Sequence, residues 1–132
     1  MKPVLSLALL VALTVPTTAG ARTLVSYSES GGIANRRVAL TVTTAGVANV
    51  TANRRPRTFH LHASTLQRLR HLLATARFDR VHPPPTSCAD CLIHSVQYGG
   101  HRVRYDDSQA KHVPRSVRAA VAELGRIARG GR

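Results

Sequence analysis

Apolar and polar residues alternate along three stretches in the first half of the chain, and this alternation predicts half-buried β-strands. The stretches are Leu24 to Ser28, Arg37 to Thr43 and Arg57 to His62. In each stretch the apolar residues fall on one face, which we expect to point into the core. These inward residues are Val25, Tyr27, Val38, Leu40, Val42, Phe59 and Leu61.

The turn after the second stretch sets a register for the next strand. If Thr44-Ala45-Gly46 is a three-residue loop with Gly46 in the left-handed conformation, Val42 faces Ala48, Leu40 faces Val50 and Val38 faces Ala52. All of these apolar residues then share one face. A two-residue turn would place Val42 opposite Asn49, so the longer loop is preferred. The next turn is expected at Asn53-Arg54-Arg55-Pro56.

Helical spacing follows the strands. Leu66, Leu69, Leu73 and Ala76 recur at intervals of three and four residues, which predicts a helix that ends at about Arg77. Ser64-Thr65-Leu66-Gln67 has the form of a capping box at its start. Phe78 is expected to pack after the helix, and His82-Pro83-Pro84-Pro85 stops any continuation and forms an extended linker.

The last third of the chain predicts a hairpin and a second helix. Leu92 to Tyr98 and His101 to Tyr105 flank a Gly99-Gly100 turn, which pairs Tyr98 with His101, Val96 with Val103 and His94 with Tyr105. Pro114 suits the first position of a final helix, whose inward residues are Val117, Val121, Leu124 and Ile127. The sequence therefore predicts an α+β fold: a strand meander, a helix, a β-hairpin and a helix, with both helices packed on one face of an antiparallel sheet.

The first 21 residues have the order of a secretory signal peptide. Lys2 is followed by an apolar run from Val4 to Val15 and then by small residues that end in Ala19-Gly20-Ala21. The run is shorter than the ~20 residues that a membrane-spanning helix needs. We therefore expect residues 1–21 to be removed and residues 22–132 to form a single small basic domain that is secreted, outside the cell or in its envelope.

The charge of the chain is strongly positive. The sequence has 19 Lys and Arg against 6 Asp and Glu, a net charge of +13 with histidine neutral. Such a charge attracts anionic polymers and acidic protein faces at low salt. One functional hypothesis is thus a secreted basic module that binds anionic envelope polymers or extracellular nucleic acid.

Cys88 and Cys91 are separated by two residues. In an exported chain a local disulfide is the expected state, and so small a loop mainly fixes a turn. A catalytic redox pair would favour a helix directly after the first cysteine, whereas here a strand pattern follows. A zinc knuckle would need a second pair of ligands that the sequence does not clearly offer.

Enzymatic alternatives rest on common residue types. His60 and His62 would share a face of a strand, and His82 or His94 would have to complete a metal site by the chance of the fold. Solvent-facing histidines are the simpler interpretation, and no metal or cofactor is expected. A small secreted ribonuclease could use Glu29 as a base, a histidine as an acid and arginines on phosphate. The low aromatic content argues against it, because stacking platforms for bases are scarce.

The segment before the second strand is the most unusual part of the sequence. Two glycines free the backbone and are followed by an apolar residue in a loop, although a hairpin connection with Ile33 tucked under the sheet would also explain the pattern. The segment comprises Ser30, Gly31, Gly32, Ile33, Ala34, Asn35, Arg36 and Arg37.

From this segment onward the sequence resembles the emfourin family, small bacterial inhibitors of thermolysin-like M4 zinc metallopeptidases. Four pieces carry the resemblance by their order along most of the chain after the signal. These are Glu29 to Ala34 followed by Arg36-Arg37, the helix end Ala74 to Phe78, Cys88 to Cys91 before a Tyr-bearing strand, and the Gly99-Gly100 hairpin with Asp106-Asp107. The sequence departs from the family pattern in two respects: Ile33 stands where an aromatic residue is frequent, and many members lack the signal and the CxxC.

The resemblance implies a protein inhibitor with no catalytic residue of its own. An inhibitory loop, Ser30 to Arg37, would occlude the active-site cleft of an extracellular M4 metallopeptidase, with Ile33 in an apolar pocket beside the zinc. Arg36 and Arg37 would steer the inhibitor toward an acidic cleft rim. The resemblance is compatible with a monomer, and the partner would be the peptidase.

Overall fold

The structure is a computed structural model of the chain and describes residues 21–83 and 88–132. Residues 1–20 of the expected signal peptide, and Pro84 and Pro85 of the expected linker, lie outside the described residues. The regular elements follow one another in the order expected from the sequence. They are β1 (Thr23–Gly31), β2 (Arg36–Thr43), β3 (Val47–Ala52), β4 (Arg55–His60), α1 (Ala63–Thr75), η1 (Phe78–Arg80), β5 (Leu92–Tyr98), β6 (His101–Asp106), η2 (Asp107–His112) and α2 (Arg115–Ala128).

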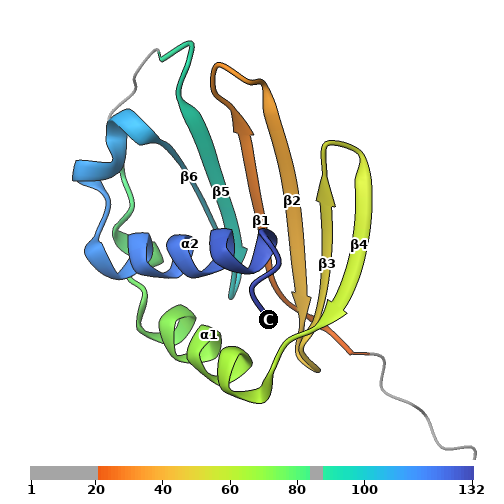
Figure 1. The fold of residues 1–132 in the computed structure, drawn as a ribbon. Helices are drawn as coiled ribbons and strands as arrows, with labels where there is room; N and C mark the ends of the chain where they lie inside the picture. Colours follow the sequence, from red (N-terminus) through yellow and green to blue (C-terminus); the bar gives the residue numbers. More distant parts are fainter. Residues whose placement is uncertain (1–20, 84–87) are drawn as a thin grey trace, which may run out of the picture.

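The six strands form one antiparallel sheet in the order β4-β3-β2-β1-β5-β6. The first four strands form a meander, and the β5–β6 hairpin adds to it through the pairing of β5 with β1. Figure 1 shows that α1 and α2 lie over the same face of this sheet. The α+β fold with both helices on one face is therefore confirmed.

The register of the first hairpins follows from the Gly46 turn. Val42 pairs with Ala48, Leu40 with Val50 and Val38 with Ala52, as predicted. Gly46 has a φ of 84°, which is the left-handed conformation that the three-residue loop requires. These pairs confirm the predicted register. A shift of one residue would have moved the apolar side chains of β3 to the solvent face.

The register of the β5–β6 hairpin is confirmed as well. Tyr98 pairs with His101, Val96 with Val103 and His94 with Tyr105. Val96, Val103 and Tyr105 are buried, and they lie on the face that the helices cover. The glycine turn therefore directs the apolar residues of both strands into the core.

One hydrophobic core joins the sheet to the helices. α1 packs on α2, and α2 also contacts β2. The fully buried side chains come from the sheet and from both helices, and their positions agree with the predicted periodicity. The largest of them are Leu40, Leu69, Leu73, Leu124, Ile127, Val25, Val42, Val50, Val96 and Val117.

The predicted capping box at the first helix is wrong. α1 begins at Ala63 with His62 at its N-cap position, and no side chain caps it. Because the helix begins before the predicted cap, Ser64 lies within its first turn and not at the N-cap position. The neighbouring Thr65 is buried, and its hydroxyl donates to the carbonyl oxygen of Arg132 (2.8 Å).

A capping box occurs elsewhere, at η2. The Asp106 carboxylate accepts hydrogen bonds from the backbone N–H groups of Ser108 and Gln109, and the Gln109 side chain accepts one from the Asp106 N–H. This arrangement satisfies the free donors at the start of η2 and turns the chain away from the sheet.

Several boundaries differ from the prediction by one to three residues, including the end of β1 at Gly31 and the end of α1 at Thr75. β4 begins at Arg55 and ends at His60, because the turn is only Asn53-Arg54, both with positive φ. Pro114 is the N-cap of α2 and not its first helical residue. β4 remains an edge strand with Phe59 buried, as predicted.

Candidate functional site

The β1–β2 turn exposes an apolar side chain. Ile33 has 92 % of its surface accessible to solvent. Among the large hydrophobic residues that the structure describes, it is the one that is exposed. β1 brings the chain to Gly31, and β2 begins again at Arg36. Figure 1 shows this turn at the end of the sheet farthest from α1. Ile33 therefore does not tuck under the sheet.

The backbone of the turn depends on glycine. Gly31 and Gly32 have φ values of 96° and 74°. A Cβ atom at Gly31 would lie 2.8 Å from the carbonyl oxygen of Cys91, too close for any side chain. The Gly32 N–H donates to the same Cys91 oxygen (3.2 Å), and the Asn35 N–H donates to the Gly32 oxygen (3.1 Å). These contacts fix the turn against the start of β5.

The two cysteines form a disulfide, as expected. Cys88 and Cys91 have Cα atoms 5.5 Å apart, within the usual range for a disulfide. The turn that they close leads directly into β5, so Cys91 presents its carbonyl oxygen to the β1–β2 turn. The disulfide is therefore part of the support of the exposed loop.

A polar network lies beneath the loop on the helix-covered face. The Tyr27 hydroxyl donates to Glu29 Oε2 (2.9 Å), and Arg36 Nε lies 3.5 Å from Glu29 Oε1. The Tyr27 hydroxyl also lies 3.3 Å from His94 Nδ1, and His94 Nε2 lies 2.8 Å from Asp107 Oδ1. Each buried polar group in this network has a partner, which stabilises the base of the loop.

Burial raises the pKa of the Tyr27 hydroxyl well above its ordinary value, and its hydrogen bond to Glu29 acts in the same direction. Tyr27 is therefore neutral and a hydrogen-bond donor at physiological pH. The side chain of Glu29 is only 8 % exposed. Its carboxylate is engaged by Tyr27 and Arg36, so it is directed away from a substrate that approaches from solvent, in contrast to the base of a ribonuclease.

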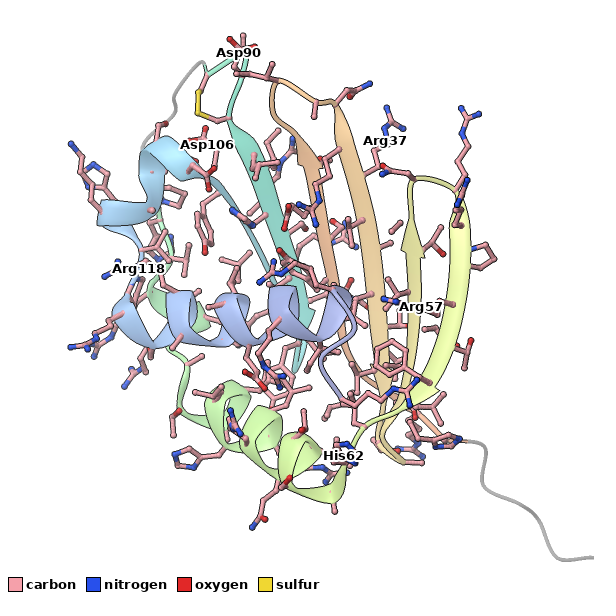
Figure 2. All side chains as sticks on the ribbon, viewed as in Figure 1. Arg37, Arg57, His62, Asp90, Asp106 and Arg118 are labelled. Atoms are coloured by element: carbon pink, nitrogen blue, oxygen red, sulfur yellow. A yellow bond between two sulfur atoms is a disulfide. The ribbon has the colours of Figure 1, made fainter. Side chains whose placement is uncertain are left out.

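The structure separates the two arginines of the predicted loop. Arg36 pairs with the buried Glu29 and so contributes to the base of the turn. Arg37 alternates with the buried Val38, so its side chain points to the face of the sheet that carries no helix. Figure 2 shows Arg37 at the end of β2 nearest the turn.

An open hollow of about 670 Å³ lies beside the loop, where the outward residues of β1, β2 and β3 meet. Besides Arg37 it contains a residue that sequence reasoning missed, Arg54 of the β3–β4 turn. The predicted strand register could have indicated that Arg54 lies near Arg37. Val38 pairs with Ala52, so the turn that follows Ala52 lies beside Arg37, and the Asn53 N–H donates to the Arg37 carbonyl oxygen (2.9 Å). The lining residues are Ser28, Glu29, Ser30, Gly31, Asn35, Arg37, Val38, Ala39, Thr51 and Arg54.

The histidines do not gather. His60 is the last residue of β4 and His62 precedes α1, so the two do not share a strand. His94 belongs to the polar network described above. Within residues 21–83 and 88–132, no group of three His, Cys, Asp or Glu side chains is placed to hold a metal ion.

No protein-family model matches the chain, and no curated protein is significantly similar to it in sequence. Over the described ranges, none of the helices is both long enough and apolar enough to cross a membrane.

Proposed function

We propose that this protein is a secreted, non-enzymatic inhibitor of thermolysin-like M4 zinc metallopeptidases. The loop from Ser30 to Arg37 enters the active-site cleft, and Ile33 fills the apolar pocket beside the zinc. The observation that carries the proposal is the almost complete exposure of Ile33 on a turn that the fold holds in place. The inhibitor supplies no catalytic residue and needs no cofactor.

Burial of Ile33 supplies a driving force for binding. Transfer of a large aliphatic side chain from water to an apolar pocket is worth about 1.5–3 kcal/mol. The glycine turn, its hydrogen bond to Cys91 and the Glu29–Arg36 pair hold the loop before the partner arrives. Because the loop is already ordered, little conformational entropy is lost on binding.

Of the two arginines expected to steer association, Arg37 now has the main role. Arg36 is engaged by Glu29, whereas Arg37 is exposed on the open face beside the loop. The net charge of the whole chain, +13, adds a general attraction to an acidic cleft rim. Steering of this kind raises the association rate more than it slows dissociation.

Export places the inhibitor where it meets its target. The sequence of residues 1–21 has the pattern of a signal peptide, and the Cys88–Cys91 disulfide is the form favoured in an oxidising compartment. A secreted metallopeptidase shares that compartment. We therefore propose that the protein acts outside the cell or in its envelope.

The decisive experiment titrates the purified secreted protein against a thermolysin-like peptidase and follows cleavage of a peptide substrate. Inhibition at or below micromolar concentration is expected, and it should persist at high salt because an apolar side chain fills the pocket. Absence of inhibition at micromolar concentration contradicts the proposal. Salt-sensitive binding to an anionic polymer in its place would support the basic binding module instead.

A further inference from the structure

The hollow beside the loop has a composition suited to an anionic group. Two guanidinium groups, of Arg37 and Arg54, are accompanied by the hydroxyls of Ser28, Ser30 and Thr51. The single acidic residue in its wall is Glu29, whose carboxylate is on the opposite face with Tyr27 and Arg36. The hollow therefore offers hydrogen-bond donors and positive charge without an internal anion.

Among the residues that the structure describes, neither of these arginines has an acidic partner. Elsewhere, Arg36 pairs with Glu29, and Arg126 binds the Glu123 carboxylate at 2.7 Å. Within the part of the chain that the structure describes, no acidic group lies within ion-pair distance of Arg37 or Arg54. A partner that brings an anion to this hollow would not have to displace an internal ion pair.

The geometry favours carboxylates of a folded protein over the phosphates of a nucleic acid. A guanidinium group binds a carboxylate or a phosphate through two parallel hydrogen bonds, so the rest of the hollow has to discriminate between them. The hollow of about 670 Å³ has room for only a few side chains. A nucleic acid would use aromatic platforms and a longer line of cations, whereas no aromatic residue lines this hollow.

The hollow and the inhibitory loop share residues. Ser30, Gly31, Asn35 and Arg37 belong to the loop and also line the hollow. A protein that receives Ile33 therefore lies over the hollow at the same time. We infer that the hollow binds an acidic side chain of the partner protein; on the proposed function, this is a Glu or Asp on the rim of the peptidase cleft.

A probe that does not depend on inhibition tests the hollow directly. An acetylated, amidated tetra-aspartate peptide is titrated into ¹⁵N-labelled protein, and the backbone amide signals are followed. Saturable shifts centred on Ser28, Ser30, Arg37, Thr51 and Arg54 are expected. Shifts spread evenly over the basic surface, or stronger binding of a single-stranded oligonucleotide at the hollow, would overturn the assignment.

Inhibition kinetics provide the second test, with a control of equal charge. The double variant R37A/R54A is compared with R102A/R104A, which removes the same charge from exposed positions of β6, at the far edge of the sheet. We expect R37A/R54A to weaken inhibition about tenfold or more, with faster dissociation, and R102A/R104A to change it less than about threefold.

The two tests separate the hollow from the proposed function. If the wild-type protein inhibits but both double variants behave alike, the hollow assignment is wrong and the inhibitor proposal stands. If the wild-type protein does not inhibit while the aspartate peptide binds at the hollow, the inhibitor proposal fails and the carboxylate site stands. All four arginines are exposed, so we expect each variant to fold. Thermal melting of each variant checks this.

Discussion

The β1–β2 turn and the β2–β3 turn lie at opposite ends of strand β2, and different interactions hold them. In the β2–β3 turn, Gly46 is buried beneath Leu66 of α1, and its carbonyl oxygen accepts a hydrogen bond from the Leu61 N–H (2.9 Å). A leucine of the amphipathic helix α1 therefore covers the glycine of this turn, while Thr44 and Ala45 stay exposed.

No helix covers the β1–β2 turn. It is held by a disulfide-closed turn and by a charged, hydrogen-bonded network, while its apolar side chain, Ile33, faces water. Both turns depend on glycines with positive φ. Turns built on glycines with positive φ therefore pack against the core at one end of β2 and hold an apolar side chain in solvent at the other.

Replacement of Ile33 by Asp should have the largest effect on inhibition. The effect should be specific to the β1–β2 end of strand β2. A charge placed in an apolar pocket should weaken inhibition by about 100-fold or more, because hot-spot contacts dominate such interfaces. The melting temperature should stay within a few degrees of wild type, since the side chain makes no core contact. Inhibition constants and thermal melting measure both quantities.

The matched control for this substitution is A45D in the exposed β2–β3 turn, which adds the same charge at the opposite end of β2. It should leave inhibition within about threefold of wild type. If I33D inhibits as well as A45D, the loop does not enter the cleft.

Gly31→Ala should be the most destabilising change in the exposed turn. The new Cβ would meet the backbone oxygen of Cys91 at 2.8 Å, and a φ of 96° is strained for alanine. We expect a loss of about 2–3 kcal/mol in the free energy of unfolding. Gly46→Ala should cost about 1–2 kcal/mol, because its Cβ meets only the mobile end of Leu66 at 3.1 Å. Urea denaturation gives both values, and equal losses would contradict this difference.

Tyr27→Phe tests the polar network under the loop. It removes the donor to the buried Glu29 carboxylate and should cost about 1–2 kcal/mol at pH 7. The pKa of Tyr27 is raised in the folded state, so its neutral form stabilises the protein below pH ~10 and that stability is lost as the pH rises further.

Y27F should therefore lose less stability than wild type when the pH is raised above 10. Denaturation curves recorded from pH 7 to pH 12 measure the difference. An identical alkaline loss in the two proteins would mean that ionisation of Tyr27 is not coupled to unfolding.

Removal of the disulfide should have a modest effect on stability and the smallest effect on inhibition. The loop between Cys88 and Cys91 is short, so the C88S/C91S variant should lose less than about 2 kcal/mol. Its inhibition should weaken by a few-fold, because Cys91 orders the exposed turn through its carbonyl oxygen. Reduction of the wild-type protein with a dithiol should reproduce both changes. A variant that retains full inhibition would show that the hydrogen bonds alone hold the turn.

Much of the fold could be predicted because its signals are local. The alternation in β2 and the Gly46 loop were enough to place Val42 opposite Ala48, and the Gly99-Gly100 turn was enough to pair Val96 with Val103. A slip of one residue would have turned the apolar side chains to solvent, so the register had one acceptable solution.

Predictions that concerned polar contacts were less accurate. The motif from Ser64 to Gln67 resembled a capping box, but α1 begins at Ala63, so Ser64 lies inside the helix. The sequence also could not reveal the bond from Thr65 to Arg132, 67 residues further on. Nor could it distinguish Arg36, which pairs with Glu29, from Arg37, which does not.

The sequence by itself determined the strands, the two amphipathic helices, the strand registers of the two glycine hairpins and the presence of an apolar residue in a glycine-rich loop. These features depend on the period of apolar residues and on the conformations open to glycine, both of which are local properties. Only the tertiary structure decided that Ile33 is exposed, that Arg37 and Arg54 line one hollow, and that Cys91 supports the loop. These arrangements join residues far apart in the chain, and they exist only once the sheet has brought β1, β2, β3 and β5 side by side.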